Sequence, residues 1–329
     1  MIDFHAHVLE AEVLERTLPN SVFGAFGEDP GAARPEPGSR MALAHERMLD
    51  VGLRLADMDE RGVDVQVLSS STVMQYTAWA EPQLQLELEA RVNDAVAEIC
   101  RSRPDRFVGS FTLPLRDLRL ALDETERAVR ELDLRVANLP AAIEGVYLGD
   151  AGFRPLWQAF HQLGVVAFIH PDGVRDPWFR RYALWNSLGQ SIEESKVIAS
   201  LILEGVLDDL PELRIVVAHG GGFLPHYFGR LDRNVRNRPA TAANISRLPS
   251  EYLRAFHLDT CVYDPAVLAV LLERAGADRL VLGTDYPVGD ADPLAVLHAA
   301  GITGDDLAAI TSRNALRLLE IHETEEAQP

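Results

Sequence analysis

The sequence predicts a (β/α)8 barrel with insertions after the first and fifth strands. Short apolar runs alternate with longer helical patterns along most of the 329 residues, as in parallel βα units. Eight such runs occur, and a chain of this length is normal for a closed eight-stranded barrel that carries insertions. An open doubly wound sheet is the alternative, but no GxGxxG motif follows the first run.

Each predicted strand is a short run of mainly apolar residues, and a helical pattern follows it. The strands are expected at residues 2–7, 63–69, 107–113, 134–139, 165–170, 213–219, 257–260 and 279–285. The helices are expected at residues 49–61, 82–101, 117–131, 153–163, 191–207, 224–236, 265–275 and 304–320.

Three stretches interrupt this rhythm within what we interpret as a single domain over residues 1–329. Residues 8–48 contain GEDPGAARPEPGSR and are predicted to form a loop or cap between the first strand and its helix. Residues 171–190 form a second insertion, after the fifth strand, and residues 237–250 form a third, more polar one.

Composition excludes several kinds of partner. The net charge of −19 argues against nucleic acid and anionic membrane surfaces. No uninterrupted apolar stretch is long enough to span a membrane, and no signal peptide precedes the first strand. The two cysteines, Cys100 and Cys261, do not form a disulfide framework, so a reducing compartment, the cytoplasm, is expected.

The chain begins MIDFHAH, which places two histidines on its first strand. Residues i and i+2 of a strand point to the same face. An extended segment would therefore direct His5 and His7 to one side together with Asp3, and Ile2, Phe4 and Ala6 to the other. Two imidazoles side by side are suited to binding a metal ion.

Three further strands end in residues that can bind a metal ion or transfer a proton. His170 ends the fifth strand, His219 the sixth and Asp285 the eighth. In a βα barrel these ends meet at one face, where active sites are built. We therefore predict that His5, His7, His170 and Asp285 bind one divalent ion per chain. Zn²⁺ is preferred, and Mn²⁺ or Fe²⁺ is an alternative. His219 is then the candidate general acid or base, and Asp285 a possible proton shuttle.

The sequence resembles the amidohydrolase superfamily, and within it the aminocarboxymuconate-semialdehyde decarboxylase-like branch. The matching motifs are DFHAH at 3–7, MDERGVDVQVLS at 58–69, IHP at 169–171, AHGGG at 218–222, GRLDR at 229–233 and GTDYP at 283–287. The resemblance implies the same four metal ligands and His219 as the catalytic histidine. It also implies that Arg230 binds a substrate carboxylate, in some members across the interface of a homodimer. A second substrate-binding arginine is expected after the first strand, where Arg40 and Arg47 are the candidates.

The lysine content bears on the number of metal ions. Binuclear members of the superfamily bridge two metals with a carboxylated lysine at the end of the fourth strand. Here that region reads RVANLPAAIEG, and the one lysine of the chain, Lys196, lies in a later helix. A mononuclear site follows, with Glu144 as the one alternative bridging carboxylate.

Aromatic residues in the insertions are candidates for the wall of a substrate pocket. Trp178 and Tyr182 lie in the second insertion and Phe23 in the first. They could line a pocket for a planar carboxylated substrate, bury a cap against the barrel, or form a dimer contact. Asp259 and Asp264 are interpreted as structural or helix-capping residues.

The predicted function is a metal-dependent, non-oxidative decarboxylase that acts on an aromatic or muconate-like carboxylic acid. A hydrolase or a hydratase with the same site residues is the alternative. A barrel that has lost its activity and binds a partner is a third possibility, but the complete ligand set argues against it.

Overall fold

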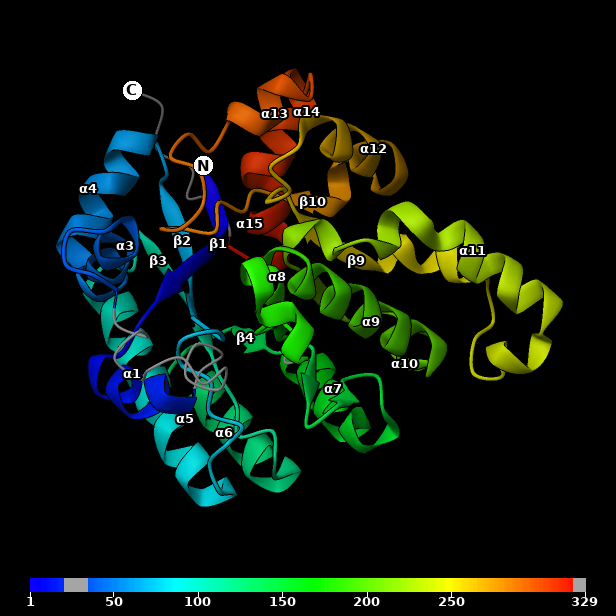
Figure 1. Ribbon diagram of the computed structural model, residues 1–329, viewed down its shortest axis with the longest axis horizontal. Helices are drawn as coiled ribbons and strands as arrows, with labels where there is room; N and C mark the ends of the chain where they lie inside the picture. The colour runs from blue at the N-terminus through cyan, green and yellow to red at the C-terminus, as the bar shows by residue number, and fades with distance from the viewer. Residues whose placement is uncertain (21–34, 175, 322–329) are drawn as a thin grey trace.

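Eight parallel strands form a barrel in the computed structural model, which describes residues 1–20, 35–174 and 176–321 (Figure 1). Neighbouring strands pair in the order β1-β2-β3-β4-β7-β8-β9-β10. Their bounds are β1 (Ile2–Val8), β2 (Val65–Ser70), β3 (Phe107–Phe111), β4 (Val136–Leu139), β7 (Val166–Ile169), β8 (Arg214–Val217), β9 (Phe256–Asp259) and β10 (Leu280–Val281). All eight lie within or next to the predicted ranges, and the predicted fold class is confirmed.

Backbone hydrogen bonds connect the segment that follows the last strand to the first strand and so close the barrel. The Phe4 N–H donates to the carbonyl oxygen of Leu282 at 2.8 Å, and the His7 N–H donates to that of Tyr286 at 2.7 Å. In return, the Tyr286 N–H donates to the carbonyl oxygen of His5 at 3.1 Å. The chain that follows β10 therefore runs beside the two histidines of β1.

Helices surround the strands (Figure 1). Asp50, Asp117 and Asp264 cap the N-termini of α4 (Val51–Arg61), α6 (Leu118–Arg130) and α12 (Pro265–Ala275), so the expected capping role of Asp264 is confirmed. No helix among the described residues is long and apolar enough to cross a membrane. The α-helices that follow the first insertion, apart from α8 in the second insertion, are α4 (Val51–Arg61), α5 (Pro82–Ser102), α6 (Leu118–Arg130), α7 (Arg154–Leu163), α9 (Gly189–Leu203), α10 (Val206–Asp209), α11 (Leu224–Asn237), α12 (Pro265–Ala275), α13 (Ala295–Ala299), α14 (Gly304–Ala308) and α15 (Asn314–Leu319).

The described parts of the first insertion are largely helical, where a loop or cap was expected. They contain α1 (Ala11–Thr17) and α3 (Arg40–Leu49). Each helix buries only two or three side chains. So few buried positions do not form a periodic pattern long enough to predict a helix from the sequence. The second insertion contains a 3-10 helix (Pro177–Ala183) and α8 (Leu184–Ser187).

Two further local features differ from the predicted elements. A short hairpin of β5 (Ala142–Ile143) and β6 (Val146–Tyr147) follows β4 and was not expected. The helix predicted at 304–320 is divided, because a π-helical turn at Ala309–Arg313 separates α14 from α15.

The barrel interior contains a register shift that changes the expected pattern of β1. Ile2 and Phe4 belong to the apolar interior, and pairing with β2 shifts between Asp3 and Ala6. At this point the His5 N–H donates to Asp3 Oδ1 at 3.1 Å. The rings of Phe4 and His5 both contact Phe168, with centroid distances of 5.9 and 5.2 Å. The expectation that Phe4 points to the face opposite His5 is therefore wrong.

Candidate metal centre and active site

The side chains of three strand ends converge at one point at the carboxyl end of the barrel. His5 Nε2 lies 3.3 Å from His7 Nε2, and Asp285 Oδ1 lies 2.9 Å from His7 Nε2 and 3.3 Å from His5 Nε2. The ring centroid of His170 lies 4.9 Å from those of both histidines. One ligand atom from each of the four residues lies within 4.8 Å of the others.

The ionisation of these side chains suits a divalent cation. Burial lowers the pKa of His7, and it lowers that of His170 well below the usual value, so both imidazoles are neutral and have a free lone pair. Burial opposes ionisation of Asp285, but the imidazoles around it outweigh this effect and lower its pKa. Three imidazoles and one carboxylate, converging on one point, fit a single divalent ion.

Hydrogen bonds behind two of the candidate ligands fix their orientation. His5 Nδ1 lies 2.7 Å from Asp259 Oδ2, and His170 Nδ1 lies 3.0 Å from Thr72 Oγ1. When Nδ1 donates its proton to such a partner, the lone pair of Nε2 is left for the metal. Asp259 is in turn held by the backbone N–H groups of Gly220 and Cys261, each at 3.1 Å. Asp259 therefore orients the candidate ligand His5. The sequence alone indicated a structural or helix-capping residue at Asp259 and did not predict this role.

Close packing beside Asp259 depends on a glycine in the GTDYP motif. A Cβ atom at Gly283 would lie 2.7 Å from the Cβ of Asp259. Any larger residue would displace either the carboxylate that holds His5 or the segment that carries Asp285.

His219 forms a buried pair with a carboxylate of α9. Its Nδ1 lies 2.5 Å from Glu194 Oε1, and its ring centroid lies 5.2 Å from that of His5 and 5.0 Å from that of His170. Burial alone would lower the pKa of His219, but the Glu194 carboxylate raises it to about 10. The pair therefore favours the protonated imidazole, in which the proton on Nε2 is the one that Glu194 does not engage.

Sequence reasoning missed Glu194, although a signal for it exists. The buried face of α9 includes Gln190, Glu194, Val197, Ile198 and Leu201, in helical spacing. A carboxylate on an otherwise mainly apolar face requires a partner. That partner lies at the end of β8, 25 residues later in the chain.

A cavity of about 550 Å³ opens beside His219 and Asp285. The Tyr263 hydroxyl, which lines it, lies 3.3 Å from Asp285 Oδ2, the oxygen turned away from His5 and His7. The other lining residues include Gln190, Ser191, Phe223, His226, Cys261, Val262 and Val267. No arginine is among the described residues of this wall.

The two arginines proposed from the first insertion do not line this cavity. Arg40 Nη2 donates to the carbonyl oxygen of Val288 at 2.8 Å. Arg47 Nε forms an ion pair with Asp57 Oδ2 at 2.7 Å. In this structure Arg40 braces the segment after Asp285, and Arg47 joins α3 to α4.

Arg230 is exposed on α11 and does not line the cavity. It lies one helical turn beyond His226, which does. Asp232, two residues after Arg230, accepts hydrogen bonds from the backbone N–H and the hydroxyl of Ser250, at 3.0 and 2.7 Å. Within one chain, the geometry therefore does not bring Arg230 to His219.

The aromatic candidates of the second insertion are also exposed, Trp178 by 56 % and Tyr182 by 85 %. Neither lines the cavity, and Phe23 lies outside the described residues. Lys196 pairs with Glu193 at 2.9 Å, and Glu144 pairs with Arg116 at 3.1 Å. Neither Lys196 nor Glu144 approaches the metal cluster in a way that could bridge a second ion.

A barrel with three imidazoles and a carboxylate gathered at the carboxyl ends of its strands defines a class of metal-dependent enzymes. The chain belongs to the amidohydrolase family, whose model matches residues 2–321. The resemblance inferred from the motifs is confirmed.

Several named relatives of this chain are decarboxylases, and one is a 2-keto-4-carboxy-3-hexenedioate hydratase from Sphingobium sp.. The chain is 33% identical over 240 residues to 2-amino-3-carboxymuconate-6-semialdehyde decarboxylase of Dictyostelium discoideum, over 72% of this chain and 67% of that protein. Its structure matches 5-carboxyvanillate decarboxylase from Sphingomonas paucimobilis with a TM-score of 0.86 and 28% identity, over 98% of this chain and 99% of the other. Dihydroxybenzoic acid decarboxylase from Polaromonas sp. JS666, with bound manganese and 2-nitroresorcinol, matches with a TM-score of 0.81 and 25% identity, over 100% and 99%.

We predict that Asp259→Asn weakens metal binding by about ten- to a hundredfold, because His5 loses the carboxylate that orients its ring. Wild-type protein should contain one divalent ion per chain. Metal content by elemental analysis, and affinity by competition with a chelator, are the measurements.

Asp264→Asn is the matched control, because Asp264 caps α12 and is exposed, and asparagine caps a helix equally well. Equal metal affinity in the two variants would contradict the role given to Asp259. Two ions per chain in fully active protein would contradict the mononuclear site.

Proposed function

We propose that the protein is a metal-dependent, non-oxidative decarboxylase of an aromatic or muconate-like carboxylic acid. The observation that carries this proposal is the buried pair of His219 and Glu194, which places a charged proton donor beside the histidine cluster and on the wall of a cavity. The decarboxylases among the relatives support the same reaction.

The reaction needs a proton at the carbon that carries the carboxylate. His219 Nε2 delivers this proton, the conjugation of the substrate is interrupted, and the bond from that carbon to the carboxylate then breaks. The electron pair of the broken bond restores the conjugated system, and CO2 leaves. A divalent ion bound by His5, His7, His170 and Asp285 would act as a Lewis acid that holds the substrate and stabilises developing negative charge.

The neighbouring side chains keep the proton donor ready. Glu194 holds His219 through Nδ1, so that Nε2 faces the cavity and the imidazolium form is favoured. Tyr263 donates to Asp285 Oδ2 and so orients the carboxylate with Oδ1 toward the histidines. Asp285 is also proposed as the shuttle through which a proton from solvent reaches His219 after each turnover.

For the ion itself we propose Zn²⁺, because three nitrogen ligands and one oxygen ligand suit a borderline cation. Mn²⁺, which the Polaromonas decarboxylase contains, is the alternative. Elemental analysis of protein purified without added metal distinguishes the two.

We further propose a homodimer in the cytoplasm, in which Arg230 of one subunit meets the substrate carboxylate in the cavity of the other. Phe223 and Tyr227, exposed by 48 % and 63 %, lie on the same helical region and support a contact there. The two free cysteines support a reducing compartment. Sedimentation equilibrium tests the dimer.

The direct test of the function is CO2 release from a panel of hydroxybenzoates and muconate semialdehydes with metal-reconstituted protein. Release of CO2 from at least one acid, with the decarboxylated product in equal amount, is expected. Hydrolysis or hydration of a panel member without CO2 release would overturn the proposal.

We predict that His219→Ala keeps its metal but loses about 10²–10⁴-fold in turnover, because a positioned general acid contributes that much. Elemental analysis and steady-state kinetics are measured on the same preparation. If His219→Ala loses its metal while His170→Ala keeps it, the two roles have been exchanged.

We predict that Glu194→Gln keeps its metal, lowers kcat by at least about tenfold and moves the alkaline limb of the kcat profile to lower pH. The sign follows from the pair: the carboxylate raises the pKa of His219, so its loss lowers that pKa, and the proton donor is then lost at lower pH. Glu193→Gln, a change at the more exposed neighbour, should leave the profile in place. An unmoved profile in Glu194→Gln would contradict the proton-donor role.

We predict that Arg230→Lys lowers kcat/KM by roughly ten- to 150-fold without changing the metal content, because lysine cannot replace a bidentate contact to a carboxylate. This range corresponds to about 1.5–3 kcal/mol. Arg233→Lys, at another exposed position of α11, is the control. An unchanged kcat/KM in Arg230→Lys would remove Arg230 from the site.

A further inference from the structure

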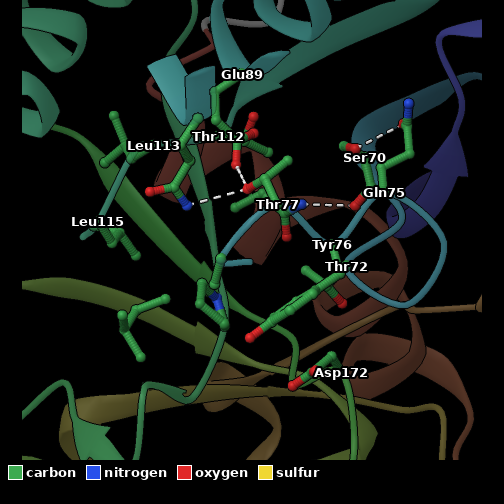
Figure 2. A pocket seen from close by; sticks show the side chains of 15 residues that line it. Ser70, Thr72, Gln75, Tyr76, Thr77, Glu89, Thr112, Leu113, Leu115 and Asp172 are labelled. Carbon is green, nitrogen blue, oxygen red and sulfur yellow. Dashed lines mark hydrogen bonds between the residues drawn. The ribbon is translucent and has the colours of Figure 1, made fainter. Parts of the chain in front are cut away.

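A second, smaller cavity, of about 40 Å³, lies at the same end of the barrel as the metal cluster. Figure 2 shows the side chains that line it. Segments that follow β2, β3, β4 and β7 enclose it. The cavity beside His219 lies among the segments that follow β8, β9 and β10. In the closed strand order, these two groups of strands lie on opposite sides of the barrel. We call the second cavity the Asn138 pocket.

The Asn138 pocket shares a wall with the metal cluster. Thr72 lines it, and Thr72 Oγ1 lies 3.0 Å from Nδ1 of the candidate ligand His170. Asp172, which also lines it, follows His170 by two residues. A group in the pocket is therefore separated from a candidate metal ligand by a single side chain.

The lining is suited to a hydrogen-bond donor and not to a carboxylate. None of the described lining residues is basic, whereas Glu89 and Asp172 contribute carboxyl groups. Burial raises the pKa of Glu89 to about 7, and the Thr77 hydroxyl donates to its Oε1. An anion in this pocket would meet the acceptors of Glu89 and Asp172, and no basic side chain among the described lining residues would compensate its charge. The reacting carboxylate of a substrate therefore belongs elsewhere, in the cavity of His219.

One buried acceptor in the pocket lacks a donor. Asn138 is 2% exposed, and its Nδ2 donates to the carbonyl oxygen of Ser70 at 2.7 Å. This bond fixes the orientation of the amide, and Asn138 Oδ1 then has no hydrogen-bond partner within the described part of the chain. A buried acceptor of this kind calls for a donor from a ligand or a water molecule. Leu113, Leu115 and Ile143 complete the wall with apolar surface, against which the carbon that carries a donor group can pack.

We propose that the Asn138 pocket binds a hydroxyl or amino substituent of the substrate, remote from the reacting carboxylate, with Asn138 Oδ1 as the acceptor. Asn138 is then a specificity-determining residue that separates acids with a donor substituent from those with a methyl ether or hydrogen in its place. This inference rests on the proposed function, since it supposes a carboxylic acid that reacts at His219.

Phenol and anisole are the probes for the pocket, because they differ only in whether the oxygen can donate. Calorimetric titration is carried out on protein as purified, with its metal content measured. Phenol should bind wild-type protein at least about tenfold more tightly than anisole. In Asn138→Leu the ratio should fall to near one, at unchanged metal content.

Asn314→Leu is the matched control. Asn314 is also buried and its Oδ1 also lacks a partner, but it does not line the pocket. This variant should keep the wild-type ratio. A wild-type ratio near one, or a preference for phenol that persists in Asn138→Leu, would overturn the proposal.

A crystal structure of wild-type protein with phenol decides the matter even where Asn138→Leu does not fold. The phenol hydroxyl is expected within hydrogen-bond distance of Asn138 Oδ1, and phenol bound elsewhere overturns the assignment. Saturating 3-hydroxybenzoate or 4-hydroxybenzoate should displace phenol. Simultaneous binding of phenol with both acids would mean that the pocket serves a separate small molecule and not the substrate.

The outcome is independent of the test for CO2 release. CO2 release without any selectivity that depends on Asn138 would overturn the pocket and leave the decarboxylase in place. Selectivity for phenol that depends on Asn138, without CO2 release from any acid, would overturn the decarboxylase and keep the pocket as a binding site for a donor group.

Discussion

The buried carboxylate of Asp3 joins the first strand to the last, and the placement of the candidate metal ligands depends on this junction. Its Oδ1 accepts from the N–H groups of His5 and Thr284, and its Oδ2 accepts from the Thr284 hydroxyl at 2.7 Å and from Gln66 Nε2 at 3.2 Å. One side chain thus connects β1, β2 and the segment after β10. The register shift that it accompanies turns His5 inward, while Thr284 precedes Asp285, the carboxylate that completes the cluster.

Two acid–histidine pairs give neighbouring imidazoles different properties. Asp259 and Glu194 each approach the Nδ1 atom of a histidine, His5 at 2.7 Å and His219 at 2.5 Å. The Nε2 atom of His5 faces two other ligands, so its lone pair is directed to a shared cation. The ring of His219 instead lines the cavity, where a proton on Nε2 can reach a substrate. The same local chemistry therefore supports metal binding in one position and proton transfer in the other, because the surroundings of Nε2 differ.

The face of the barrel above these residues divides into two regions of different character. The cavity on one side contains His219, Asp285 and Tyr263, and the Asn138 pocket on the other contains neutral polar groups and two carboxyls. Thr72 and His170 lie between them and touch. A planar acid that spans this face would place its carboxylate in the cavity beside His219 and its donor substituent in the Asn138 pocket. Reaction and specificity would then be assigned to different strands of the barrel, which is how a βα barrel accommodates different substrates.

The sequence by itself determined the barrel and the candidate ligands, because these are local properties. An apolar run that ends in His170 or Asp285 predicts both a buried strand and a polar group at its end, and parallel strands in a barrel bring such ends together. The sequence also shows directly that no lysine follows the fourth strand, which is why a mononuclear site was predicted. Only the tertiary structure decided which acid serves which histidine, since Asp259 lies 254 residues from His5. It likewise paired Arg47 with Asp57 and left Arg230 exposed. Through a register shift it brought the rings of Phe4 and His5 both against Phe168. These outcomes depend on contacts between elements that are distant in the chain, and periodicity along a single strand or helix carries no information about them.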